Sequence, residues 1–277
     1  CKRYYLVFNG EIYNHNFLRK ELPNSITWKG HSDSETLINM ISFWGTTKTL
    51  SKIVGMFAFV IWDRYENKLI LVRDRLGEKP LYYGFIGKTF IFGSELKAIE
   101  AFPEFKKDIN KEALSNYLKF GYIPAPHSIY EGIYKLPPGN FIEIYREDIK
   151  TQNLPKVLKY WSLEMIASNQ ISNPYLGSEI NAINKLDYLL KESISGQLLG
   201  DVQIGAFLSG GIDSSSVVSI MQSQSINPIN TYTIGYKESK YDESKYARNI
   251  ASFLGTNHNE LFISPNDALE AIKLLPQ

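Results

Sequence analysis

The first half of the chain contains short β-rich runs joined by polar or glycine-bearing turns. A first strand is expected over Tyr4–Phe8, ending at the turn signal Asn9-Gly10. Four further strands are expected over Gly55–Trp62, Lys68–Val72, Leu81–Phe85 and Thr89–Gly93. Strands that follow one another this closely favour an antiparallel sheet, because antiparallel neighbours need only a short connection.

Apolar residues recur at helical intervals in two places of this half. One predicted helix covers Asn14–Leu22 and stops before Pro23, and the other covers Ser34–Trp44. Ser32 or Asp33 is the expected N-cap of the second helix. A short strand over Ser25–Trp28 is expected between them. Residues 1–120 are therefore predicted to form an α+β domain built on an antiparallel sheet.

The second half alternates strands with helices after a strongly amphipathic helix from Ile180 to Leu199. The predicted strands are Val202–Leu208, Asn230–Gly235 and His258–Ile263, and the helices that follow them are Ser214–Ser223, Asp242–Leu254 and Asn266–Leu275. This alternation indicates parallel βαβ units in a doubly wound sheet, with nucleotide bound at the carboxyl ends of the strands. The fold class is α/β overall, with residues 1–120 and 179–277 as domains and the proline-bearing residues 121–178 as their connection.

Composition restricts the class of protein. The 277 residues fit two domains, and 44% hydrophobic residues suffice for packed cores. A net charge of +1 gives no electrostatic case for nucleic acid or an anionic membrane as a partner. The apolar runs are too short to span a bilayer. One cysteine cannot form an internal disulfide, which fits a reducing, cytoplasmic compartment.

The stretch Ser209-Gly210-Gly211-Ile212-Asp213-Ser214-Ser215 lies between an expected strand and an expected helix. Glycines let the backbone approach a ligand, the free N–H groups of the helix point at it, and three serine hydroxyls add donors, which predicts a phosphate site. No lysine precedes the serines, so the loop is not a Walker A motif. The alternative is an ordinary turn before a serine-capped helix. Asp213 is a candidate Mg²⁺ ligand or, alternatively, only an acidic residue at a helix N-terminus.

An ordered set of motifs in the first half closely resembles the glutaminase domain of glutamine-dependent asparagine synthetases. The set comprises Val7-Phe8-Asn9-Gly10-Glu11-Ile12-Tyr13-Asn14, Ser32-Asp33, Gly55-Met56-Phe57-Ala58-Phe59 and Arg73-Asp74-Arg75-Leu76-Gly77-Glu78-Lys79-Pro80-Leu81-Tyr82-Tyr83. The resemblance implies an N-terminal-nucleophile hydrolase fold. It also implies that the Asn9 side chain and the Gly10 N–H form an oxyanion hole, and that Glu11 and Asp33 bind the α-amino group of glutamine.

Cys1 does not fit the nucleophile of that family, an N-terminal cysteine whose own amine acts as base. It precedes Lys2-Arg3 and lies eight residues before Asn9 in one apparent strand. A strand rises about 3.3 Å per residue, so Cys1 could not easily fold back onto an oxyanion hole of its own strand. We therefore expect the nucleophile upstream. The resemblance also implies a second synthetase loop beyond Gln277, so we expect the chain to be a fragment that is inactive by itself.

The loop Ser209–Ser215 resembles the pyrophosphate loop of asparagine synthetases and other adenylating ATP pyrophosphatases. Leu208 and Ile234 match positions whose backbones contact adenine in that family, although both also fit a strand core. The resemblance implies that glutamine supplies ammonia and that ATP, with Mg²⁺, converts aspartate to asparagine through a β-aspartyl adenylate. It is compatible with a homodimer. Two alternatives remain: the same chemistry on another carboxylate, such as an amino-sugar acid or a β-lactam-type ring closure, and a non-catalytic nucleotide-binding remnant.

Overall fold

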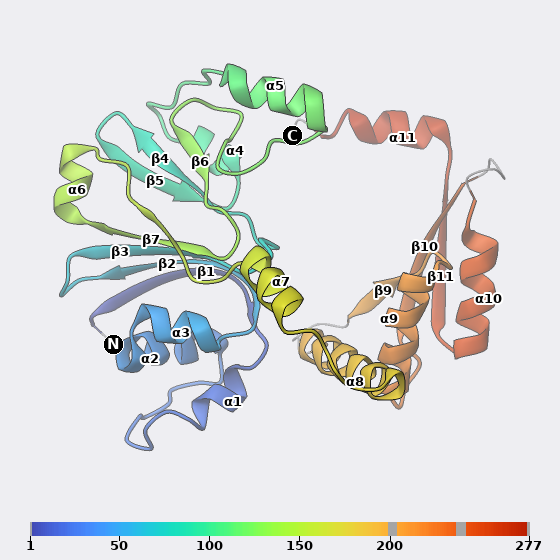
Figure 1. The fold of residues 1–277 in the computed structure, drawn as a ribbon. Helices are drawn as coiled ribbons and strands as arrows, with labels where there is room; N and C mark the ends of the chain where they lie inside the picture. The colour runs from blue at the N-terminus through green and yellow to red at the C-terminus, as the bar shows by residue number, and fades with distance from the viewer. Residues whose placement is uncertain (1, 199–203, 237–241, 276–277) are drawn as a thin grey trace. The chain divides into compact units, whose positions relative to one another are not determined.

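The computed structural model describes residues 2–198, 204–236 and 242–275 (Figure 1). The chain divides into two compact units, residues 1–174 and residues 175–277, and each is described by itself.

Unit 1 contains a five-stranded antiparallel sheet in the order β1-β2-β3-β7-β8. Its strands are β1 (Tyr4–Ile12), β2 (Gly55–Asp63), β3 (Lys68–Arg73), β7 (Asn140–Tyr145) and β8 (Val157–Lys159). A second antiparallel sheet has the order β5-β4-β6, from β4 (Tyr82–Ile86), β5 (Thr89–Gly93) and β6 (Ile133–Lys135). The antiparallel pairing predicted for this half is confirmed.

Alternation along β2 gives the five-stranded sheet two apolar faces. Phe57 and Phe59 pack with Leu37 in a core on the helical side. Ala58 and Val60 pack on the opposite side, in a core that includes side chains of the second sheet. Unit 1 is therefore layered, with the helices of residues 15–52 on one face of the larger sheet and the smaller sheet on the other (Figure 1). Its helices are α1 (His15–Arg19), α2 (Asp33–Trp44), α3 (Thr46–Lys52), α4 (Leu96–Glu100), α5 (Lys111–Phe120), α6 (Arg146–Thr151) and α7 (Leu163–Ser172).

Two parts of unit 1 differ from the pattern expected from sequence. Residues 23–32 form turns and irregular backbone, so the strand expected over Ser25–Trp28 is wrong. Residues 133–159, expected within a connection between domains, contribute β6, β7 and β8 to the two sheets of unit 1. β7 pairs with β3 through five residue pairs and is an interior strand of its sheet.

Unit 2 contains a three-stranded parallel sheet in the order β11-β10-β9. Its elements in chain order are α8 (Glu179–Gln197), β9 (Gly205–Phe207), α9 (Ile212–Ser223), β10 (Asn230–Tyr236), α10 (Ser244–Leu254), β11 (Asn257–Ile263) and α11 (Pro265–Ile272). The alternation of strands and helices is confirmed, although residues 199 and 202–203 of the predicted elements lie outside the described residues. Val218 of α9 and Ala247 of α10 pack with Leu208 over the sheet. Within the described ranges, no helix is long and apolar enough to cross a membrane.

Candidate functional site

The backbone N–H of Gly10 points away from the strand to which β1 is paired. β1 and β2 pair antiparallel without a break from Tyr4↔Asp63 to Ile12↔Gly55. Tyr13 N donates to Val54 O at 2.8 Å, so the hydrogen-bonded pairs on β1 are the odd-numbered residues. The N–H groups of Gly10 and Ile12 therefore face the outer edge of β1, where Ile12 N donates to Asp33 Oδ2 at 3.0 Å. The predicted oxyanion donor and a predicted glutamine-binding carboxylate thus lie along one strand edge.

A cavity lies beside the N-terminal part of β1. A cavity of about 1040 Å³ is lined by Phe8 of β1, by Gly30 and Ser32 of the loop before α2, and by Ile38 of α2. Asn9, Gly10 and Asp33 are not among the residues that line it.

Gly10 tolerates no side chain where it stands. Its φ is +147°, and a Cβ would lie 2.1 Å from the carbonyl oxygen of Met56. Gly55, which pairs with Ile12, has the same constraint, because its Cβ would lie 2.0 Å from the carbonyl oxygen of Glu11. The two glycines let β1 and β2 approach closely at the site.

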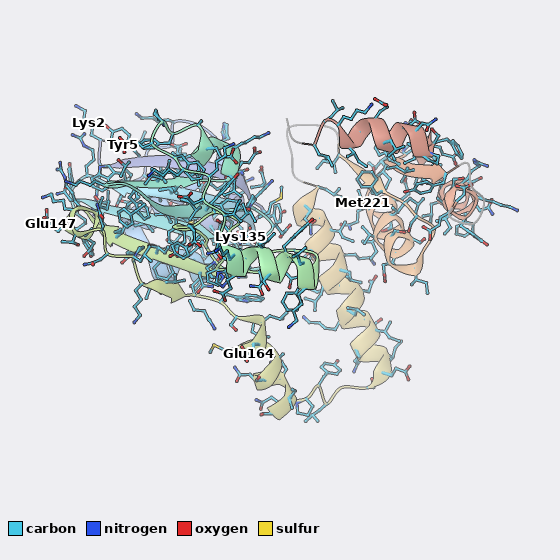
Figure 2. The ribbon with its side chains drawn as sticks, turned by 90° about the horizontal axis from the view of Figure 1, so that it is seen from above. Lys2, Tyr5, Lys135, Glu147, Glu164 and Met221 are labelled. Atoms are coloured by element: carbon cyan, nitrogen blue, oxygen red, sulfur yellow. The ribbon has the colours of Figure 1, made fainter. Side chains whose placement is uncertain are left out.

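The side chains of Asn9, Glu11 and Tyr13 leave β1 on one face, since side chains alternate along a strand. Asn9 is exposed, and its Nδ2 donates to Ser94 Oγ at 3.2 Å. Tyr5, on the same face, is 62% exposed (Figure 2). This face is therefore open at Asn9, as a group that contacts substrate requires.

Tyr13 stands among carboxylates on this face. Burial, with the negative charges of Glu78, Asp74 and Glu11 acting in the same direction, raises the pKa of Tyr13 to about 12. Its hydroxyl keeps its proton at neutral pH and remains a hydrogen-bond donor.

Arg19 fixes the loop that precedes Asp33. Its guanidinium donates to the carbonyl oxygens of Gly30 and Ser32, both at 2.9 Å, and lies 4.2 Å from the ring centre of Trp28. The loop carbonyls are thus used by a side chain from α1 rather than by a neighbouring strand. Within the strand expected over residues 25–28, Ile26 N donates to Pro23 O at 3.1 Å, which closes a turn instead of pairing with a strand.

Glu35 binds the same loop from the α2 side. It accepts hydrogen bonds from Lys29 N at 2.7 Å and Gly30 N at 2.9 Å. The Lys29 N–H, then that of Gly30 and the charge of Arg19, lower the pKa of the Glu35 carboxyl against the opposing effect of burial. Ser32 caps α2, accepting from Glu35 N at 3.2 Å. Asp33 therefore starts a helix whose N-terminal loop is held from both sides.

The Asp74 carboxylate is fully buried and accepts five backbone N–H groups. Oδ2 accepts from Phe57 N at 3.2 Å, on the residue that pairs with Gly10. The other donors belong to the following loop: Leu76 N at 3.1 Å, Gly77 N at 2.6 Å, Glu78 N at 3.0 Å and Lys79 N at 2.9 Å. Asp74 thus joins the loop after β3 to the part of β2 that lies against the oxyanion donor.

In unit 2, the predicted phosphate loop joins β9 to α9 as expected. Gly211 is the N-cap of α9, Ser209 Oγ lies 3.0 Å from Ser214 Oγ, and Ser214 Oγ donates to Gly211 O at 3.3 Å. The Ser215 hydroxyl is buried and makes no hydrogen bond within the described part of the chain. An unpartnered hydroxyl beside free helix N–H groups fits a ligand with acceptor oxygens.

Gly210 allows α10 to approach this loop. Its φ is +87°, and a Cβ would lie 2.7 Å from Tyr246 Cβ. Asp213 is exposed in the first turn of α9. No three His, Cys, Asp or Glu side chains gather as metal ligands among residues 2–198, 204–236 and 242–275. A divalent ion at Asp213 would therefore need phosphate oxygens as most of its ligands.

The two predicted adenine positions lie at the carboxyl ends of neighbouring parallel strands. Leu208 directly follows β9, and its N–H donates to Tyr232 O at 2.9 Å. Its carbonyl accepts from the Thr233 hydroxyl, next to Ile234. Both are near the loop, while Cys1 lies outside the described residues, so its exclusion as nucleophile stays a prediction.

Sequence reasoning assigned no role to Arg19, Glu35, Asp74 or Ser94. Asp74 carried a signal, because it belongs to one of the motifs of the resemblance. The sequence around Arg19, Glu35 and Ser94 gave no such signal, because their partners are distant in sequence or belong to the loop backbone.

Models of known families match both units of the chain. The model of the glutamine amidotransferase domain matches residues 1–161, which makes the first unit an amidotransferase domain. The model of asparagine synthase matches residues 185–277. The chain therefore belongs to the family of glutamine-hydrolysing asparagine synthetases.

Curated relatives match nearly the whole chain. A putative glutamine-hydrolysing asparagine synthetase 2 of Methanocaldococcus jannaschii is 35% identical over 96% of this chain and 50% of its own length. Asparagine synthetase 3 of Bacillus subtilis is 30% identical over 98% of this chain and 44% of its own. Amidase chyE of Penicillium rubens is 30% identical over 91% of this chain and 38% of its own length. The chain thus spans half or less of these relatives.

A solved structure of glutamine phosphoribosylpyrophosphate amidotransferase from B. subtilis is 17% identical, with a TM-score of 0.40 over 97% of this chain and 50% of that one.

Proposed function

We propose that the protein is an ATP- and glutamine-dependent amidotransferase that converts aspartate to asparagine. One observation carries the proposal: each unit presents the donors that one half of this reaction needs. Unit 1 has Asn9 and the outward N–H of Gly10 near Asp33. Unit 2 has a hydroxyl-lined glycine loop at the start of α9.

Unit 1 would hydrolyse glutamine. Attack on the carboxamide carbon places negative charge on its oxygen, and the Asn9 amide and Gly10 N–H would stabilise that oxyanion. Glu11 and Asp33 would bind the α-ammonium group of glutamine by charge-assisted hydrogen bonds. Glutamate and ammonia are the products. Keeping the ammonia away from water would leave it unprotonated and nucleophilic.

Unit 2 would activate the acceptor. A β-carboxylate oxygen of aspartate attacks the α-phosphorus of ATP, and pyrophosphate leaves. The loop Ser209–Ser215 would hold that pyrophosphate, with the buried Ser215 hydroxyl as one donor. Ammonia then attacks the acyl carbon, and AMP leaves with the transferred oxygen. Mg²⁺, when bound, would offset phosphate charge, with Asp213 as its protein ligand.

The identity of the acceptor is the part that rests on family names. Two relatives are named asparagine synthetases, which supports aspartate, whereas the Penicillium relative is named an amidase. An amino-sugar acid or a β-lactam-type ring closure would use the same adenylation. A non-catalytic remnant would bind nucleotide without turnover.

Isotope transfer tests the proposal. The complete gene product is incubated with ATP, glutamine and aspartate labelled with ¹⁸O in its β-carboxylate. We expect asparagine, pyrophosphate and AMP that carries ¹⁸O, detected by mass spectrometry. ADP and phosphate as products would overturn the adenylate. If ¹⁸O-labelled AMP forms from another labelled carboxylate but not from aspartate, that carboxylate is the acceptor. If the protein binds ATP but forms no product, it is a non-catalytic nucleotide-binding remnant.

A further inference from the structure

We infer that Ser94 is a positioning residue for glutamine hydrolysis, because its hydroxyl holds the Asn9 amide so that the second N–H of that amide is free for the oxyanion. The inference rests on the proposed function of unit 1. It concerns a residue from outside the strand that carries the oxyanion donors.

The contact links two different sheets. Asn9 belongs to β1 of the five-stranded sheet, and Ser94 directly follows β5 of the three-stranded sheet. Asn9 Nδ2 donates to Ser94 Oγ at 3.2 Å. A side-chain amide nitrogen carries two N–H donors, so one remains after this bond. The bond therefore leaves Asn9 able to donate to a substrate oxygen.

Asn9 needs such a partner because its side chain is exposed. Its backbone is fixed by the pairing with Ala58 of β2, but the terminal torsion of an asparagine has a broad preference. Oxyanion stabilisation depends on donors that already point at the developing charge. A freely turning amide would spend much of its time in other orientations, so an acceptor that fixes it raises the rate rather than the affinity for the substrate.

Ser94 is suited to this because it stands on a rigid support. The residue before it, Gly93, pairs with Tyr82 at the end of β5. The helix after it, α4, is anchored by the fully buried Ile99. Within the described part of the chain, the Ser94 hydroxyl makes no hydrogen bond other than that to Asn9. The second sheet thus fixes the position of Ser94, and its hydroxyl is available to accept the hydrogen bond from the Asn9 amide.

The test uses the complete gene product with the variant Ser94→Ala. We expect kcat for glutamine hydrolysis to fall about tenfold, less than the 10²–10³-fold typical of losing an oxyanion donor. KM for glutamine and asparagine formation from added ammonia should stay unchanged, because neither depends on the amide orientation. Ser94→Thr keeps the hydroxyl and should restore most of kcat.

Ser51→Ala is the matched control. It removes an exposed hydroxyl that donates to Lys48 O at 2.8 Å in α3, and it should change none of these quantities. An unchanged kcat in Ser94→Ala would overturn the inference, as would an equal fall of the ammonia-dependent activity, which would indicate a structural role. The variant Asn9→Ala distinguishes a failure of the inference about Ser94 from a failure of the proposed function. If Asn9→Ala loses glutamine hydrolysis and Ser94→Ala does not, only the inference fails, whereas a wild-type protein without glutamine hydrolysis contradicts the proposed function.

Discussion

Gly10 and Gly55 stand on neighbouring strands at points where each backbone meets the carbonyl of the other strand. A methyl group at Gly10 would overlap the Met56 carbonyl, and the backbone there also has a φ that disfavours side chains. Backbone atoms cannot turn aside as a flexible side chain can. The close approach of β1 and β2 therefore depends on glycine itself.

We expect Gly10→Ala to lower the free energy of unfolding by more than about 3 kcal/mol, because a clash adds to the strain of a positive φ. Urea denaturation measures this. Gly121→Ala is the control: its φ is +76°, but no atom lies within 4 Å of the added Cβ. It should cost only about 1 kcal/mol. Equal losses for the two variants would show that the contact with Met56 is unimportant.

Asp74→Ala should be among the most destabilising single changes in unit 1. The change leaves five N–H groups without their acceptor, and a buried unsatisfied donor such as Phe57 N costs about 1–3 kcal/mol, with smaller costs for the four partly buried donors. We expect a loss above about 3 kcal/mol in urea denaturation. Asp148→Ala removes a half-buried capping carboxylate in α6 that accepts from Tyr145 N, and should cost about 1 kcal/mol. A loss at Asp74 no larger than at Asp148 would contradict the network.

At the scale of elements, the loop before α2 should depend on the charge of Glu35. The pKa of Glu35 lies below its ordinary value of 4.5, first because Lys29 N donates to it. A lowered folded-state pKa contributes stability that is present above 4.5 and is lost as the pH falls through the folded-state pKa.

We therefore expect wild type to be more stable than Glu35→Gln at pH 7, with the difference shrinking steadily as the pH is lowered below 4.5. Thermal unfolding of both proteins over this range measures it. A difference that does not change with pH would show that the carboxylate charge plays no part in holding the loop.

The pattern of apolar and polar residues predicted those strands and helices whose packing partners lie nearby in the sequence or recur at regular intervals. The strands of unit 2 were predictable because each is followed by its own crossover helix. β7 was missed because Glu143 interrupts its apolar run. In the structure, Glu143 accepts from Lys68 Nζ at 3.1 Å, across the pairing with β3. No local window contains that partner.

The residues of the candidate site also divide into those that sequence motifs predicted and those that they did not. Asn9, Gly10 and Asp33 were predictable from motifs, and the structure brings the Gly10 N–H and Asp33 to one strand edge. Ser94 was not predictable, because it lies 85 residues from Asn9 and meets it only when two sheets pack. The backbone groups that Arg19 and Glu35 bind belong to residues 29–32, directly after the strand wrongly expected over Ser25–Trp28, and no local pattern indicated these contacts.

At the scale of the whole molecule, the two units carry separate donors, so their reactions should be separable. Ser215→Ala should lower pyrophosphate release from ATP while glutamine hydrolysis continues, because Ser215 lies in unit 2. Asn9→Ala should lower glutamine hydrolysis, while pyrophosphate release and asparagine formation continue when ammonia is supplied. Parallel assays of glutamate, pyrophosphate and asparagine measure both. Loss of glutamine hydrolysis in Ser215→Ala would contradict the division.

The unbroken register of β1 on β2 has a consequence for which sequence changes the site can accept. Side chains and N–H directions both alternate with a period of two. If one residue were inserted between Tyr4 and Asn9 while the strand kept its pairing from Tyr4, the Asn9 amide would face the helices and the Gly10 N–H would enter the ladder. A change in the length of β1 by an odd number of residues would therefore misdirect both donors without altering either residue, so the spacing of residues is itself part of the oxyanion site.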